Sequence, residues 1–107
     1  MIDLTQEQQL IVKNILSHYV PEFDVWAFGS RVNGNSKTYS DLDLVIKTEK
    51  PLSLLTLSNL TEAFSLSDLP WKVDVLDWSS INDNFREIIK ARYIELQKGK
   101  LKSSLVK

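Results

Sequence analysis

The residues best suited to chemistry in this chain are aspartates that recur at strand-like spacing. Asp41 and Asp43 are separated by one residue, and Asp74 lies between Val73 and Val75. Side chains two positions apart on a strand point to the same side, so Asp41 and Asp43 would present two carboxylates to one face, with their Cα atoms about 6.6 Å apart. Mg²⁺ prefers such oxygen ligands and binds through one or two carboxylates plus substrate phosphates. The pattern predicts a divalent-cation site.

A third carboxylate on a neighbouring strand would complete a site for two ions about 4 Å apart, one activating the attacking oxygen and one neutralising the leaving group. We predict that Asp74 supplies it, because a charge between two valines of a central strand would be costly without a cation. Asp77 is the alternative, although alternation along the strand directs it to the opposite face. The competing interpretation is that Asp41 and Asp43 are a solvated or turn-forming pair.

Gly29 and Ser30 follow an apolar stretch and predict a turn that lies close to a ligand. A glycine at a strand exit lets the backbone approach a phosphate, and the next N–H groups can point at it. Ser30 adds a hydroxyl donor. Arg31 either neutralises phosphate charge or forms a surface ion pair, and the sequence leaves both roles open.

These residues need a scaffold, which the apolar periodicity predicts. A capping box at Thr5 and Gln8 begins a helix over residues 6–19, and a final helix capped by Ser79 or Ser80 is predicted to end at Gly99. Between them the pattern predicts strands at 23–28, 41–47 and 71–76, a polar loop at 29–40 with room for one helical turn, and a helix at 52–65. This order describes an α/β fold in which three strands are backed by helices.

Composition limits the kinds of protein this chain can be. Its 107 residues, 43% hydrophobic and 25% charged, suit one domain, predicted at 1–98 with a lysine-rich tail at 99–107. A formal charge of −1 gives the surface no general attraction for nucleic acid, so no direct nucleic-acid binding is predicted. The absence of cysteine, of a signal-like amino terminus and of an apolar run of about 20 residues predicts a cytoplasmic protein without a membrane segment.

The spacing of these residues resembles a known family. Gly29-Ser30, ten intervening residues, Asp41-Leu42-Asp43 and a later apolar-Asp-apolar strand are similar to the motif of the DNA polymerase β-like nucleotidyltransferase superfamily. The strings from Phe28 to Gly34 and from Ser40 to Leu44 especially resemble the minimal nucleotidyltransferases, which are encoded beside HEPN-domain partners. The resemblance extends from the first predicted helix to the last.

The resemblance implies a single-domain nucleotidyltransferase fold with a small mixed sheet backed by helices. It also implies ATP as substrate, two Mg²⁺ ions held by Asp41, Asp43 and Asp74, and a nucleotide-binding turn at Gly29 and Ser30. Members of the family act as antitoxins that bind a HEPN toxin and, in some cases, attach AMP to a tyrosine of it. We therefore expect a hetero-oligomer with a HEPN protein.

Two other functions remain open. The chain could neutralise its partner by binding alone, in which case substitution of Asp41 and Asp43 would leave protection intact. It could also modify a small molecule such as an aminoglycoside. We rank this lower, because related enzymes of that kind usually carry an additional domain for the acceptor.

Overall fold

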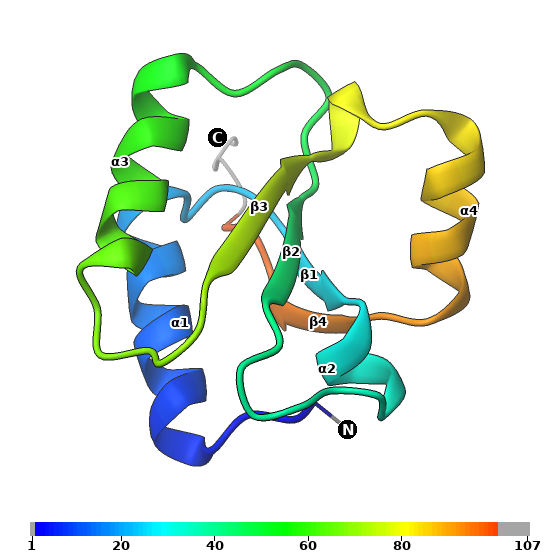
Figure 1. Ribbon diagram of the computed structural model, residues 1–107. Coiled ribbons are helices and arrows are strands. Elements are labelled where there is room, and N and C mark those ends of the chain that lie inside the picture. The colour runs from blue at the N-terminus through cyan, green and yellow to red at the C-terminus, as the bar shows by residue number, and fades with distance from the viewer. Residues whose placement is uncertain (1, 101–107) are drawn as a thin grey trace.

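A mixed β-sheet forms the centre of the protein, and helices cover both of its faces (Figure 1). The computed structural model describes residues 2–100, and within them the four strands lie in the order β3-β2-β1-β4. Strand β1 is antiparallel to both β2 and β4, whereas β2 and β3 are parallel. The predicted α/β class is therefore confirmed. The strands are β1 (Val25–Phe28), β2 (Leu42–Ile46), β3 (Val73–Asp77) and β4 (Ile94–Gln97).

Two long helices pack on one face of the sheet. Helix α1 (Gln6–Tyr19) begins with the predicted capping box, in which Thr5 and Gln8 exchange backbone-to-side-chain hydrogen bonds. Helix α3 (Leu54–Ser65) lies against α1 and β3. Their inward side chains join the main core, whose buried members include Val12, Leu16, Leu60, Phe64 and the β2 residues Leu42, Leu44 and Ile46.

Helix α4 (Asp83–Ala91) packs on the opposite face, on the right-hand side of Figure 1. Ile89 of α4 is buried with Phe28 and Val45 in a second, smaller core. Because side chains alternate along β2, the residues that flank Val45 on its own face are Asp43 and Lys47. The Asp43 side chain therefore lies on the face toward α4, whereas Leu42 and Leu44 are buried in the main core.

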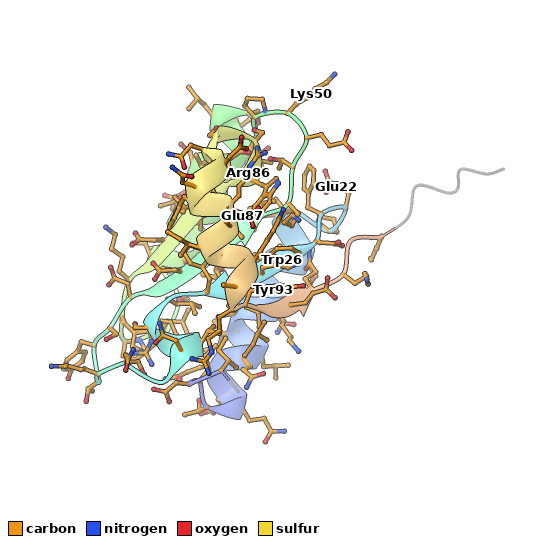
Figure 2. All side chains as sticks on the ribbon, turned by 90° about the vertical axis from the view of Figure 1, so that its right-hand side faces the viewer. Glu22, Trp26, Lys50, Arg86, Glu87 and Tyr93 are labelled. Atoms are coloured by element: carbon orange, nitrogen blue, oxygen red, sulfur yellow. The ribbon has the colours of Figure 1, made fainter. Side chains whose placement is uncertain are left out.

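An aromatic cluster holds α4 and the following turn against the sheet (Figure 2). The ring of Trp26 stacks on Tyr93 with centroids 3.8 Å apart, and the Lys47 Nζ lies 3.6 Å from the centroid of Trp26. Arg86 of α4 donates a 2.8 Å hydrogen bond to the carbonyl of Trp78. These contacts hold the helix against β1 and against the turn that follows β3.

The structure corrects the prediction for the C-terminal part of the chain. A short 3₁₀ turn, η1 (Trp78–Ser80), precedes α4, and Asn82 rather than a serine caps the helix. The helix ends at Ala91, and residues 94–97 form β4 instead of continuing it. The apolar spacing in this region suits a helix, but pairing with β1 satisfies the hydrogen-bonding groups of an edge that would otherwise be open.

The predicted loop after β1 contains one helical turn, α2 (Ser30–Asn33). At the other end of the chain, the Gly99 N–H donates to Asp24 and the Lys100 N–H to the carbonyl of Pro21, so the first residues of the predicted 99–107 tail contact the domain. The remainder of that tail, 101–107, lies outside the described residues. Within residues 2–100, every helix is too short or too polar to cross a membrane.

Candidate functional site

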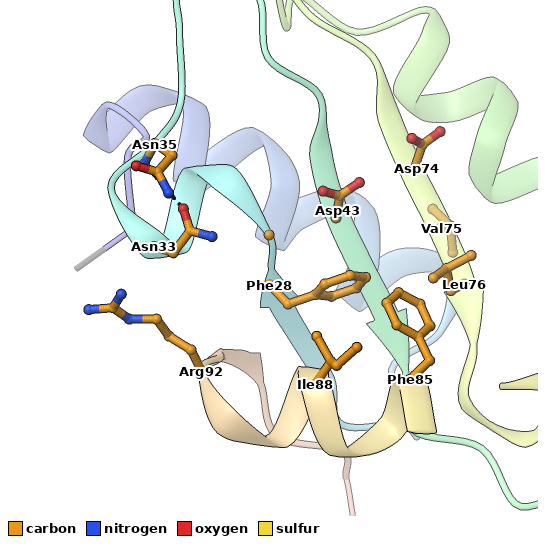
Figure 3. A pocket seen from close by; sticks show the side chains of 11 residues that line it. Phe28, Asn33, Asn35, Asp43, Asp74, Val75, Leu76, Phe85, Ile88 and Arg92 are labelled. Atoms are coloured by element: carbon orange, nitrogen blue, oxygen red, sulfur yellow. Dashed lines mark hydrogen bonds between the residues drawn. The ribbon is translucent and has the colours of Figure 1, made fainter. Parts of the chain in front are cut away.

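A cavity of about 700 Å³ lies between the sheet, α2 and α4 (Figure 3). Its volume falls in the range that holds a small ligand. One edge is acidic, the floor is apolar, and the side toward α2 is polar. The lining residues are Phe28, Gly29, Asn33, Asn35, Asp43, Asp74, Val75, Leu76, Phe85, Ile88 and Arg92.

Asp43 and Asp74 form the acidic edge. They are register partners on the parallel strands β2 and β3, so both side chains project from the same face of the sheet. The pKa of Asp43 is raised to about 6, chiefly by burial and in addition by the nearby charges of Asp74 and Asp41. On its other side Asp74 lies 3.4 Å from the ammonium group of Lys72. Two carboxylates that repel each other at a cavity wall are arranged to share a cation.

Asp41 lies one residue before β2 and is exposed. Its charge contributes to the raised pKa of Asp43, but its side chain does not line the cavity. In the described part of the chain no three acidic, histidine or cysteine side chains are close enough to form a ready metal cluster. The structure thus brings Asp43 and Asp74 together, and metal binding by all three aspartates stays a prediction.

Gly29 occupies the point where β1 approaches Asp43. Its backbone has φ 81° and ψ −157°, a conformation open almost only to glycine. A Cβ at this position would overlap the Asp43 carboxylate, with Cγ at 3.2 Å. Ser30 follows as the first residue of α2 and is half-buried, and N–H groups in the first turn of a helix lack intrahelical acceptors. The turn is therefore shaped for close approach of an acceptor oxygen.

Arg31 points away from the cavity into the structure. Its guanidinium donates to the carbonyls of Asp3, Lys37, Thr38 and Ser40 and lies 4.3 Å from the ring centroid of Trp71. The residue is 4% exposed. This geometry makes Arg31 the anchor of the 34–40 loop. Its Nη1 also lies 3.8 Å from the Asp3 carboxylate, so the ion pair named as one alternative is present, although Arg31 itself is buried. Its predicted contact with nucleotide is not favoured by this orientation.

Asp77 is placed far from the acidic edge, at the opposite end of β3. Its carboxylate accepts hydrogen bonds from Thr48, from the Leu52 N–H and from Ser79. Burial raises the pKa of Asp77, but these hydrogen bonds outweigh it and lower the pKa below its ordinary value. Asp77 therefore caps η1 and holds the start of the segment that leads to α3. The geometry favours Asp74 over Asp77 as the partner of Asp43.

Sequence reasoning missed several residues that line the cavity. Asn33 and Asn35 follow the Gly29-Ser30 turn, and the Asn35 N–H donates to the Asn33 side chain at 3.1 Å. Phe85 and Ile88 come from α4, and Arg92 follows its last turn. Arg92 could not have been found, because the predicted helix continued through it. The asparagines do lie in a polar loop beside a candidate motif, which is a weak signal.

The site fits Mg²⁺ on its own chemistry. Its donors at the acidic edge are carboxylate oxygens, the hard ligands that this ion takes. Burial, and after it the charges of Asp74 and Asp41, raise the pKa of Asp43, so the ionised carboxylate is costly there and a cation would offset that cost. Moreover, the space that a Cβ at residue 29 would fill is kept open beside that carboxylate.

Comparisons with known proteins agree with this geometry. A sequence model of the family described as nucleotidyltransferase domain matches residues 11–102. The chain is 54% identical over 96 residues to the probable protein adenylyltransferase MntA of Haemophilus influenzae, covering 90% of this chain and 84% of that protein.

Solved structures show the same fold at low sequence identity. A crystal structure of a toxin–antitoxin complex with AMP-PNP matches with a TM-score of 0.71 at 20% identity, over 89% of this chain and 76% of that one. A complex of the tri-AMPylated Shewanella oneidensis HEPN toxin with its MNT antitoxin matches with a TM-score of 0.59 at 20% identity, over 90% and 76% of the two chains.

Proposed function

Because this chain belongs to the nucleotidyltransferase domain family, we propose that it transfers AMP from ATP to a hydroxyl group of a HEPN-domain protein, as the antitoxin of a toxin–antitoxin pair. Membership confirms the family resemblance seen in the sequence. The acceptor class is supported by the relative from Haemophilus influenzae, named a probable protein adenylyltransferase, and by the AMPylated toxin in the Shewanella oneidensis complex.

The observation that carries the proposal is the pairing of Asp43 with Asp74 beside Gly29 in one cavity. Nucleotidyl transfer needs anionic ligands for metal next to a turn that admits phosphate. Bound at this edge, Mg²⁺ would act as a Lewis acid that neutralises charge on the phosphoryl oxygens. Asp43 and Asp74, with Asp41 beside them, would hold it. The apolar floor, which includes Phe28 and Phe85, suits the flat face of a base.

In the proposed reaction the acceptor oxygen forms a bond to the α-phosphorus of ATP. The bond from that phosphorus to the bridging oxygen breaks, pyrophosphate leaves and the hydroxyl proton is released. The chain's own part is to position the triphosphate at the Gly29-Ser30 turn and to exclude water from the cavity. Glycine at position 29 serves the first task, because any side chain there would occupy the space beside Asp43.

The test is incubation of the purified chain with its genomically adjacent HEPN protein, Mg²⁺ and ATP labelled at the α-phosphate. We expect label on the HEPN protein, and loss of transfer when Asp43→Asn is introduced. Absence of label with the wild-type chain would refute the proposal.

A second assay separates catalysis from simple binding. Bacterial growth in the presence of the HEPN protein is compared for the wild-type chain and the double variant D41N/D43N. An enzyme that protects by modification loses protection in the variant, whereas a binding module keeps it. Co-purification of the variant with the HEPN protein shows that the interface is intact.

A further inference from the structure

A nucleotide bound in the cavity would place its phosphate charges beside the acidic edge formed by Asp43 and Asp74. A nucleoside triphosphate carries several negative charges, and Asp43 and Asp74 add more at one wall. Metal ions at that wall would offset the charge near the α-phosphate and part of the charge on the leaving group. The phosphate furthest from the wall still carries charge that a further cation can pair, because desolvated phosphate charge is costly when unpaired.

Two other cationic side chains near the site, those of Arg31 and Lys72, make contacts outside the cavity. Arg31 is enclosed by backbone carbonyls and Trp71. Lys72 pairs with Asp74 and does not line the cavity. Among the residues that the structure describes, Arg92 is the one cationic side chain in the cavity lining.

Arg92 lies at the opposite end of the cavity from Asp74. Figure 3 shows its guanidinium extending toward the α2 side, below Asn33 and Asn35. The residue is exposed and has an extended backbone, with φ −159° and ψ 108°. Its neighbours fix the turn, since Tyr93 stacks on Trp26 and Ile94 pairs with Ala27 on β1. The guanidinium thus extends from a rigid support into the polar end of the cavity.

We propose that Arg92 binds the terminal phosphates of the nucleotide and thereby makes the site prefer a triphosphate over a monophosphate. A guanidinium suits this task because its fork of N–H donors matches two phosphate oxygens at once. Asn33 and Asn35 add amide donors on the same side. The inference rests on the proposed function and specifies which part of the substrate Arg92 recognises.

The test compares binding of two nucleotides by isothermal titration calorimetry in the presence of Mg²⁺. The ligands are a non-hydrolysable ATP analogue and AMP, and the proteins are wild type, Arg92→Gln, Arg92→Lys and the control Lys90→Gln. Lys90 is exposed, lies two residues before Arg92 at the end of α4, pairs with Glu87 and is outside the cavity lining. Loss of a charged hydrogen-bonding partner should weaken binding of the ATP analogue about tenfold or more.

We expect Arg92→Gln to lose affinity for the ATP analogue. Its affinity for AMP should stay within about twofold, because AMP lacks the terminal phosphates that Arg92 contacts. Arg92→Lys should be intermediate and Lys90→Gln unchanged. Equal binding of the ATP analogue by wild type and Arg92→Gln overturns the inference. So does an equal loss for both nucleotides, an equal loss in Lys90→Gln, or a wild-type chain that does not prefer the triphosphate.

The same proteins separate this inference from the proposed function. AMP transfer by the wild type together with unchanged nucleotide affinity in Arg92→Gln defeats only the role of Arg92. Conversely, a wild type that transfers no AMP defeats the proposed function, while the titrations still decide the role of Arg92. Thermal unfolding of each variant checks that the substitution at this exposed position leaves the fold intact.

Discussion

The backbone of Gly29 lies directly against the carboxylate of Asp43, so that a Cβ added to the glycine would overlap the Asp43 side chain. The two residues are brought together by antiparallel pairing, in which Phe28 of β1 is the register partner of Asp43 on β2. A glycine that the backbone conformation requires and a carboxylate that we propose binds metal thus occupy one corner of the cavity.

Alanine at position 29 should damage both stability and activity. It would be held in a conformation that costs about 1–3 kcal/mol for a residue with a Cβ, and it would displace Asp43. Gly34→Ala is the matched control, because Gly34 also has positive φ but an added Cβ there meets nothing within 4 Å. Urea unfolding and AMP transfer are measured for both variants. Full activity of Gly29→Ala would show that Asp43 has no fixed place in the site.

The metal-free protein should become more stable on mild acidification because of Asp43. Its pKa is raised to about 6 in the folded chain, from 3.8. The folded state therefore binds this proton more tightly than the unfolded state. Above pH 6 the carboxylate is ionised and destabilises the folded chain. This destabilisation is relieved as the pH falls from 6 toward 4 and the carboxylate is protonated.

The comparison that isolates this effect is wild type against Asp43→Asn, both in EDTA. The variant should have the higher melting temperature at pH 7, and the difference should shrink as the pH is lowered to 5. A difference that is independent of pH would contradict the assigned environment of Asp43.

Substitution of Asp74 should impair AMP transfer, whereas substitution of Asp77 should lower stability. Asp74→Asn removes a carboxylate from the cavity edge, so we expect transfer to be lost while the melting temperature is kept. Asp77→Asn disrupts the cap formed with Thr48, Leu52 and Ser79 and should cost about 1–3 kcal/mol, with transfer retained by the folded fraction. Loss of transfer in Asp77→Asn together with full transfer in Asp74→Asn would instead make Asp77 the third metal ligand.

Arg31→Lys should destabilise the chain rather than weaken nucleotide binding directly. Lysine cannot reproduce the hydrogen bonds that Arg31 donates to four carbonyls, and the loss should be about 2 kcal/mol or more. Arg92→Lys, at an exposed arginine, is the control for stability and should unfold like wild type. Urea unfolding and limited proteolysis of the 34–40 loop measure the effect. A stable Arg31→Lys variant with impaired ATP binding would restore the nucleotide role.

Much of the scaffold could be predicted from local patterns. The capping box at Thr5 and Gln8 and the apolar spacing behind it predicted α1 with the observed bounds, because these interactions are made within the helix itself. The pattern along 41–47 predicted β2, which spans Leu42–Ile46, whereas the shared face expected for Asp41 and Asp43 stays a prediction, because Asp41 lies one residue before the strand. Prediction failed at Ile94–Gln97, where pairing with β1 decided in favour of a strand over a helical pattern.

The sequence by itself determined the family motif, the identity of the acidic residues and the order of most elements, since each depends on residues close together in the chain. Only the tertiary structure decided that Asp43 pairs with Asp74 and that Asp77 serves as a cap. It also directed Arg31 inward and placed Arg92 in the cavity. The physical reason is that these roles depend on strand register and on packing between distant segments, which no local spacing of residues encodes.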